Sequence, residues 1–512
     1  MAGVAVWDAI SPWRSDLRGY FTGLCQNRLP EEATIMVKKI LFTLALVALT
    51  TLAGGAQDAK SLVSMTSKAM GADQVKTIQL SASGMEYAFG QAYNPASPWP
   101  GWKMKSETRT IDFDAPALRI ERVADTPDPT RKGGGLQPGA MQQLIVNAIT
   151  PWPNQLPIWL TPYGFLRQAA RNDVTLGSAT MGGKKYSVVT FIAPNKAKVN
   201  GYIGADNMIA KVETWIDSPM LGDTPYSETY SDYKDFGGVK VPTHIVERQG
   251  DYPTLDLMIS DAKANVAANI APPQRGGGAP GGGGGGPQGP SSQQLGDGVF
   301  LIMPAYAAIA VDMKDGIVVL EGPQSTMRGE QIIAEVHKDI PGKSIKYVFN
   351  THSHFDHSSG LRAFVAEGAT IITSQTNKGY FEKIFALPHT LVPDKLSQNH
   401  AKVKVELVGD KRVLTDGVHT IEIHKTQGSL HNEGLLFAYL PKEKVLLEAD
   451  SFNPPATADA AAPPNPANAL LLDNINRLKL DVETIVPVHY PADGRKVSID
   501  ELKRAVGQRA TK

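Results

Sequence analysis

The chain has almost no cysteine: Cys25 is the only one among 512 residues. It precedes residues 36–56, MVKKILFTLALVALTTLAGGA, which follow the order of a secretory signal: a methionine with two lysines, an apolar run, and small residues. Cleavage after Ala56 would leave an exported protein without disulfides or cysteine metal ligands. We therefore expect a periplasmic or secreted protein, with residues 1–35 as an upstream extension from a misassigned start. The alternative, a short helix in a cytosolic protein, accounts less well for the lysine pair.

The chain also lacks an excess of either charge. Its 51 basic and 51 acidic residues give a formal net charge of zero, so nothing favours nucleic acid or an anionic membrane surface as a partner. The apolar run within residues 36–56 is too short to span a bilayer comfortably, and no stable membrane span is expected. A small-molecule substrate is the predicted partner, and the oligomeric state stays open.

A chain of this length exceeds one ordinary hydrophobic core, which predicts two or three domains. Residues 271–294, APPQRGGGAPGGGGGGPQGPSSQQ, cannot pack a core and predict a flexible linker. The linker separates a domain at residues 57–270 from a domain at residues 295–512. We expect each domain to fold separately.

Residues 57–270 begin with a helix-like pattern at 59–70 and continue in long alternating stretches, which predict a mainly antiparallel, half-barrel-like β-domain. One helix followed by long strands resembles the half-barrel of periplasmic lipoprotein carriers, which hold acyl chains in an apolar cavity. No catalytic constellation is visible here, and His244 is expected to be structural. The aromatic residues are expected to form core or cavity wall. They include five of the seven tryptophans: Trp99, Trp102, Trp152, Trp159 and Trp215.

Residues 295–512 alternate apolar strands with helical patterns. The stretches GIVVLEGP at 316–323 and IKYVFNT at 345–351 read as buried strands, and residues 326–340 lie between them as a helix. A capping box, Ser498 to Glu501, opens the last predicted helix. Buried strands that alternate with helices predict sheets covered by helices, and the whole chain is expected to be of the α+β class.

The stretch THSHFDHSSG, residues 351–360, places four possible metal ligands within six positions of a chain that has only 11 histidines. Residues two apart on an extended chain point to the same side, so His352 and His354 can bind one ion together. Asp356 and His357 follow after the chain turns, where they could face a second ion. Imidazole and carboxylate in this mixture are typical ligands of zinc-type metals.

With this motif, residues 295–512 resemble the metallo-β-lactamase superfamily, whose αββα sandwich carries one or two metal ions at the edge of its paired sheets. The resemblance implies further ligands at strand ends, and His431, Asp450 and His489 each follow an apolar strand in the required order. Carried over residue by residue, it implies two Zn²⁺, or other divalent ions, bridged by Asp450. The first ion would be bound by His352, His354 and His431, and the second by Asp356, His357 and His489.

A water held between two cations has its pKa lowered towards about 7, so a metal-bound hydroxide is expected to cleave a carbonyl substrate. The resemblance implies Asp356 as the catalytic residue that orients this water. A β-lactam, lactone or other ester is slightly favoured because the protein is expected to be exported. A glyoxalase II type thioesterase is the alternative. An alternative of another class is a periplasmic protein that binds a lipid or another hydrophobic ligand and carries the metal domain as an accessory.

Two departures from the commonest superfamily pattern leave the subfamily open. The motif continues as DHSSG where a glycine pair is frequent, and Glu321 stands where an aspartate is common. Tyr306, Tyr380 and Tyr490 are candidates for substrate contact, with plain packing equally favoured. We expect the metal domain to hydrolyse its substrate without the β-domain.

The signal-like pattern predicts a mature chain that begins near Gln57. N-terminal sequencing of the protein from a secretion-competent host measures this directly. A soluble protein that keeps Met1 or Met36 at its terminus would contradict the prediction.

Overall fold

The structure is a computed structural model. It describes residues 58–507 apart from 126–130, 136–140, 147–149, 151, 195, 269, 271–288, 305, 456 and 458–464. The predicted upstream extension and signal, and most of the predicted linker, therefore lie outside the described residues. Ala59–Lys512 form one compact unit.

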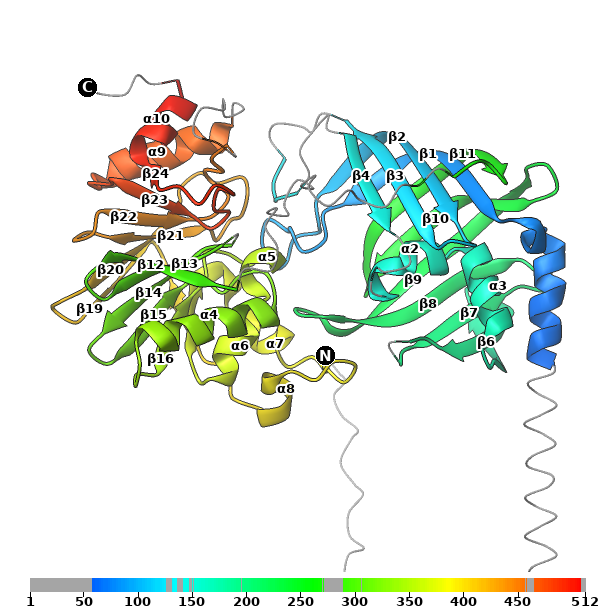
Figure 1. The fold of residues 1–512 in the computed structure, drawn as a ribbon, viewed down its shortest axis with the longest axis horizontal. Coiled ribbons are helices and arrows are strands. Elements are labelled where there is room, and N and C mark those ends of the chain that lie inside the picture. The colour runs from blue at the N-terminus through cyan, green and yellow to red at the C-terminus, as the bar shows by residue number, and fades with distance from the viewer. Residues whose placement is uncertain are drawn as a thin grey trace, which may run out of the picture. The chain divides into compact units, whose positions relative to one another are not determined.

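An 11-stranded sheet occupies the first half of the chain, in the order β4-β3-β2-β1-β11-β10-β9-β8-β7-β6-β5, and its strands curve around one another (Figure 1). Every pairing between neighbours is antiparallel, so the predicted antiparallel domain is confirmed. Its strands are β1 (Thr77–Tyr87), β2 (Gly101–Asp112), β3 (Ala117–Ala124), β4 (Met141–Val146), β5 (Thr175–Met181), β6 (Lys184–Ile192), β7 (Lys198–Ile203), β8 (Ile209–Ser218), β9 (Gly222–Asp235), β10 (Lys240–Gln249) and β11 (Tyr252–Ala264).

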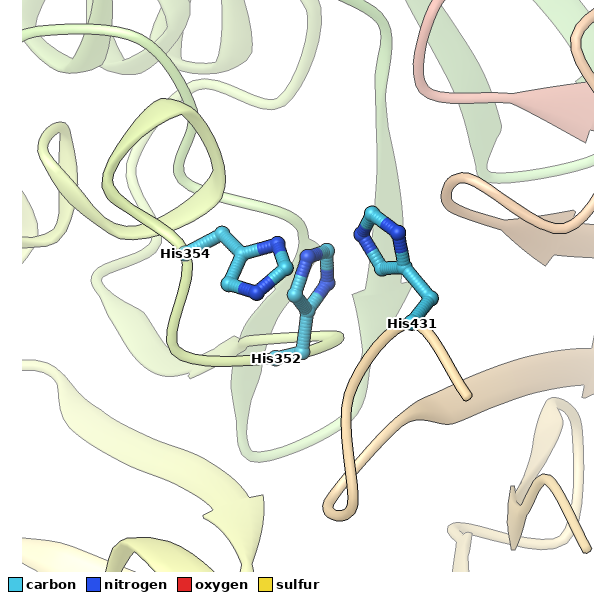
Figure 2. A group of neighbouring side chains, drawn as sticks. All are labelled: His352, His354 and His431. Atoms are coloured by element: carbon cyan, nitrogen blue, oxygen red, sulfur yellow. The ribbon is translucent and has the colours of Figure 1, made fainter. Parts of the chain in front are cut away.

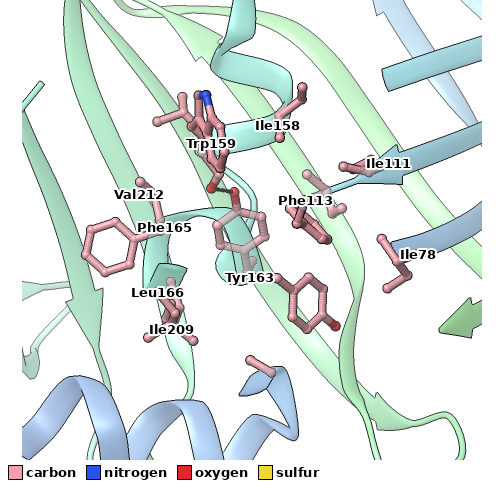
Figure 3. Close-up of a cluster of buried hydrophobic side chains, with 14 of the residues drawn as sticks. Ile78, Ile111, Phe113, Ile158, Trp159, Tyr163, Phe165, Leu166, Ile209 and Val212 are labelled. Atoms are coloured by element: carbon pink, nitrogen blue, oxygen red, sulfur yellow. Dashed lines mark hydrogen bonds between the residues drawn. The ribbon is translucent and has the colours of Figure 1, made fainter. Parts of the chain in front are cut away.

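Three helices pack against this sheet: residues 58–70, α2 (Leu156–Trp159) and α3 (Pro162–Arg171). The Thr161 side chain caps α3 by accepting a hydrogen bond from the backbone of Gly164. The buried face of α3 meets side chains of the sheet in one apolar core (Figure 3). On β7, Gly201 leaves room for the ring of Phe165, whose atoms occupy the place a side chain there would need.

Two further sheets make up the C-terminal part. The seven-stranded sheet has the order β12 to β18, and the six-stranded sheet the order β19 to β24. The strands of the first are β12 (Ser291–Gly296), β13 (Val299–Met303), β14 (Ala308–Met313), β15 (Gly316–Leu320), β16 (Ile345–Phe349), β17 (Thr370–Ser374) and β18 (Val405–Val408). Those of the second are β19 (Lys411–Thr415), β20 (Thr420–Lys425), β21 (Leu436–Leu440), β22 (Val445–Glu448), β23 (Thr484–Pro487) and β24 (Val497–Ser498).

Three apolar clusters hold these sheets in four layers. One lies between the two sheets, one between the first sheet and its helices, and one between the second sheet and its helices. Strand β15 is buried at every position because both its faces are covered. The helices are α4 (Thr326–Asp339), α5 (Phe355–Ser358), α6 (Leu361–Ala366), α7 (Tyr380–Ile384), α8 (Lys395–Asn399), α9 (Pro466–Leu478) and α10 (Ile499–Ala505). The α+β class and the capping box of α10 are confirmed.

Strand β12 begins at Ser291, inside the segment predicted to be linker. Its pairing with β13 gives these residues a place in the sheet despite their polar side chains. No helix within the described part of the chain is long and apolar enough to cross a membrane.

The two sheet-containing parts of the chain are in direct contact. Met220, between β8 and β9, is fully buried in the apolar cluster of the C-terminal helices. The backbone nitrogen of Asp223 donates to the carbonyl of Pro388 at 2.7 Å. The carboxylate of Asp223 in turn accepts hydrogen bonds from the backbone of Thr390 and Leu391. These contacts join segments far apart in sequence.

Candidate metal centre

The loop after β16 is shaped by one buried amide. The Asn350 side chain donates hydrogen bonds to the carbonyls of His352 at 2.7 Å and His357 at 3.1 Å, and it accepts one from Thr373. Helix α5 then starts immediately after His354. The turn from strand to helix therefore points the four polar residues of the motif towards one region.

The remaining three candidate ligands follow strands of the second sheet. His431 lies in the connection between β20 and β21, Asp450 follows β22, and His489 follows β23. Asp450 has a positive φ of 59°, a conformation that aspartate tolerates better than most residues. The chain is held there because Glu448 accepts hydrogen bonds from the backbone of Ser451 and Phe452.

The carboxylate of Asp450 lies among four histidines. Its Oδ2 is 3.5 Å from His352 Nε2, 2.8 Å from His357 Nε2 and 3.3 Å from His431 Nε2, and its Oδ1 is 3.2 Å from His489 Nε2. Asp450 is thus in contact with histidines of both predicted ligand sets.

His352, His354 and His431 form the first group, with their rings directed at a common point (Figure 2). The nitrogens that face this point, His352 Nε2, His354 Nδ1 and His431 Nε2, are buried and have no hydrogen-bond partner among the described residues. The opposite nitrogens of the first two are occupied: His352 Nδ1 lies 3.1 Å from Thr351 Oγ1, and His354 Nε2 lies 2.9 Å from the carbonyl of Ala92. Three buried nitrogens without a hydrogen bond, two of them facing the Asp450 carboxylate, fit a cation at this point.

Asp356, His357 and His489 form the second group. His357 Nε2 is 3.3 Å from Asp356 Oδ2 and 3.2 Å from His489 Nε2, and the Asp356 to His489 distance is 3.6 Å. Ligands that surround zinc tetrahedrally at about 2.1 Å lie about 3.4 Å from one another. The spacing of this group therefore suits an ion of that size.

The two groups differ in protonation. Burial lowers the pKa of His352 well below its usual value, and burial together with neighbouring histidines lowers that of His354 to about 3. Burial also acts to lower the pKa of His357, but the carboxylates of Asp356 and Asp450 outweigh it and raise that pKa well above the usual value. His352 and His354 are thus neutral and ready to bind a cation, whereas His357 holds a proton at neutral pH.

Two residues support the centre from outside. The Tyr306 hydroxyl donates to Asp356 Oδ2 at 3.3 Å, and its ring centroid lies 4.6 Å from that of His489. Glu321 is fully buried behind the motif, where its carboxylate accepts a hydrogen bond from the backbone of Thr351. Burial raises the pKa of Glu321 to about 7.

Sequence reasoning missed one part of the site, which comes from the β-domain. Gln91 Nε2 donates a hydrogen bond to Asp356 Oδ1 at 2.8 Å, across 265 positions of the chain. The Ala92 carbonyl accepts from His354, and Gly134 lies beside the rings of His354 and His431. No signal in the sequence marks these residues, since glutamine, alanine and glycine occur commonly in connections.

Histidines expected to be structural lie elsewhere with partners of their own. His244 pairs with Asp256 at 2.9 Å. His389 is buried, with its Nδ1 3.1 Å from a carboxylate oxygen of Asp217. Tyr380 is half-buried, with its ring centroid 5.1 Å from that of Phe381.

Residues 323–489 match the family described as the metallo-beta-lactamase superfamily. The metallo-beta-lactamase from Pontibacter korlensis is 15% identical with a TM-score of 0.33, and the match covers 43% of this chain and 97% of that chain. DIM-1 metallo-beta-lactamase is 17% identical with a TM-score of 0.32, and the match covers 43% of this chain and 96% of that chain. Rubredoxin oxygen:oxidoreductase from the anaerobe Desulfovibrio gigas is 19% identical with a TM-score of 0.32, and the match covers 42% of this chain and 60% of that chain. No curated protein matches the chain.

The opposite pKa shifts predict that cation binding at the two groups responds differently to pH. A cation at the second group must displace the His357 proton, so its dissociation constant should fall by up to about tenfold for each pH unit gained below that pKa. Binding at the first group should change less, because His352 and His354 are already neutral. Calorimetry in buffers of different ionisation enthalpy, repeated at several pH values, counts the protons released. Equal pH slopes for both binding events would contradict the prediction.

The central place of Asp450 predicts that Asp450→Asn lowers the affinity for both ions, by about 10- to 100-fold, since the charge shared by the two groups is lost. Elemental analysis after dialysis against a weak chelator measures the metal retained. Asp256→Asn, which alters an Asp–His pair outside the centre, is the control and should leave the metal content unchanged. Full metal retention by Asp450→Asn would show that Asp450 is not a ligand.

Proposed function

Because the C-terminal domain has the metallo-beta-lactamase fold and gathers seven possible ligands at one edge of its sheets, we propose that this protein is a hydrolase that binds two zinc-type ions and cleaves a carbonyl substrate. The observation that carries the proposal is the position of the Asp450 carboxylate, in contact with histidines of both groups. One ion would be bound by His352, His354 and His431. The other would be bound by Asp356, His357 and His489.

Two such ions, when bound, lower the pKa of a coordinated water towards about 7 and polarise the carbonyl under attack. The protein's own contribution begins with Asp356. Its Oδ1 is fixed by Gln91 and its Oδ2 faces His357 and His489. In the metal-free protein, burial opposes ionisation of Asp356, but the charge of His357 prevails and keeps the pKa of Asp356 below its usual value, and a bound cation would take over this role from the His357 proton. The residue is therefore an ionised, oriented acceptor for a proton of the attacking water.

The hydroxyl of Tyr306 is suited to donate a hydrogen bond to a negatively charged oxygen. Burial raises the pKa of its hydroxyl above the usual value, and the nearby Asp356 and Asp450 raise it further. The hydroxyl therefore stays protonated at neutral pH and can donate a hydrogen bond. We assign it to donating to the substrate oxygen once substrate binds, in place of its hydrogen bond to Asp356, where it would stabilise the negative charge that develops during hydrolysis.

The β-domain favours the hydrolase over a lipid carrier. Its buried residues include Glu107, Arg109 and Glu228. Arg109 pairs with Glu107 at 3.0 Å, and Arg122 pairs with the same carboxylate at 3.0 Å. A buried ionic network is a poor environment for an acyl chain, because apolar ligand surface leaves charged groups unsolvated.

We further propose that the protein acts in the periplasm or outside the cell, supported by the signal-like order of residues 36–56. A β-lactam, a lactone or another ester is the favoured substrate, since an exported enzyme meets such compounds. A thioester is the alternative.

These roles predict that Asp356→Ala lowers kcat by at least about 100-fold while the protein stays folded. The measurement is hydrolysis of a panel containing a β-lactam, an acyl-homoserine lactone, a glutathione thioester and a simple aryl ester, with circular dichroism to verify the fold. Asp256→Ala is the matched control and should keep normal turnover. A zinc-loaded wild-type protein inactive on the entire panel would count against carbonyl hydrolysis, and an active Asp356→Ala would remove Asp356 from the mechanism.

A further inference from the structure

The connection between β1 and β2 is anchored on the C-terminal domain beside the ligand groups. The backbone of Phe355 donates to the carbonyl of Gly90 at 3.2 Å, and the backbone of Glu433 donates to the carbonyl of Tyr93 at 2.8 Å. The Asn94 side chain donates to the Glu433 carboxylate at 2.5 Å. These bonds hold residues 90–94 between the loop that carries His354 and the loop that carries His431.

Aromatic packing strengthens this anchor. The ring centroid of Phe355, the first residue of α5, lies 5.2 Å from that of Phe89 and 6.2 Å from that of Trp99. Gly90 has a positive φ of 72°, and the Phe355 side chain fills the space that a side chain at Gly90 would need. The β-domain therefore packs directly on the short helix that contains Asp356 and His357.

The Ala92 carbonyl acts on the first ligand group. It accepts a hydrogen bond from His354 Nε2 at 2.9 Å and another from the Asn432 side chain at 3.3 Å. With the proton on Nε2, the Nδ1 atom of the neutral His354 ring keeps a lone pair that can bind a cation. An outer hydrogen bond of this kind orients a metal-binding histidine and fixes its tautomer. Here the acceptor belongs to the other domain.

Gln91 acts on the second group. Its amide donates to Asp356 Oδ1, while Asp356 Oδ2 is left to face His357 and His489. The two oxygens of this carboxylate therefore make different contacts. Oδ1 accepts a hydrogen bond from the β-domain, and Oδ2 faces the histidines of the second group.

A second segment of the β-domain, residues 131–135, lies over the first group. The backbone of Gly133 donates to the carbonyl of Leu430 at 2.8 Å, and that of Gly134 donates to the carbonyl of Gln91 at 3.0 Å. A Cβ atom at Gly134 would lie 2.9 Å from Cε1 of both His354 and His431, and it would also overlap the Gln91 side-chain oxygen. The backbone of Gly134 is not in the left-handed region, so glycine is needed there for space.

We propose that residues 90–94 and 131–135 of the β-domain are part of the metal centre, and that Gln91 is a positioning residue that orients Asp356 for the second ion. The inference rests on the metal site of the proposed function. It replaces the expectation that the metal domain works without its neighbour, because the β-domain supplies hydrogen bonds to one ligand of each group.

The first test replaces Gln91 by leucine, which keeps similar bulk and removes the amide donor. In a zinc titration against a chromophoric chelator, the second ion should bind about 10- to 100-fold more weakly, and the first within about threefold of wild type. With Co²⁺ the visible spectrum of the second ion should change. Gln79→Leu is the matched control: this partly buried glutamine donates to Thr110 within the same domain, and its loss should leave both affinities unchanged.

A purely structural role for Gln91 is separated by thermal unfolding. Metal-free Gln91→Leu should unfold close to the wild-type temperature, whereas the rise in unfolding temperature on adding zinc should be smaller than in wild type. Equal loss of stability with and without zinc, together with unchanged zinc affinities, would overturn the proposal.

Gly134→Ala tests the same arrangement through space and serves if Gln91→Leu is not recovered folded. Its methyl group should displace the ring of His354 or His431 and weaken the first ion by at least tenfold. Gly177→Ala is the control, since Gly177 has no positive φ and only one atom, at 3.9 Å, near the added carbon. Wild-type affinities in Gly134→Ala would overturn the proposal. A wild-type protein that binds no zinc at all would instead remove the proposed function together with this inference.

Discussion

The arrangement of the C-terminal domain depends on one electrostatic constraint: the largely buried carboxylate of Asp450 is surrounded by histidine nitrogens. Burial of so many polar atoms is costly unless they are paired or bind a cation. In the metal-free protein the proton on His357 compensates part of the negative charge, since the pKa of that ring is raised by Asp356 and Asp450. A bound cation would take over this compensation, which couples metal loading to proton release.

The same constraint explains why the centre needs a rigid surround. Four connections that follow strands must place their side chains within a few ångströms, and each is fixed by hydrogen bonds of its own. Asn350 holds the motif loop and Glu448 holds the turn at Asp450. Behind the motif, buried Glu321 accepts a hydrogen bond from the backbone of Thr351, and burial raises its pKa to about 7.

The β-domain extends this support from outside the sandwich. The Ala92 carbonyl, the Gln91 amide and Gly134 of that domain reach His354, Asp356 and His431. The contacts between Asp223 and the loop of Thr390 form a second connection between the same parts. At both places the β-domain is in direct contact with the C-terminal part of the chain, and at the first it contacts the loops that carry His354 and His431.

Local sequence patterns were enough to predict the buried strand β15, the capping box of α10, the antiparallel β-domain, and the motif from His352 to His357. The resemblance to the metallo-β-lactamase superfamily added His431, Asp450 and His489, each of which follows an apolar strand. Three features became visible only in the folded protein: Ser291 starts a strand, Asp450 contacts histidines of both groups, and Gln91 reaches Asp356. Pairing with β13 places Ser291 in the sheet, and packing between segments 265 positions apart brings Gln91 to Asp356. Neither leaves a periodicity or a motif in the chain, because the residue types involved are common and their partners are set by how the domains meet.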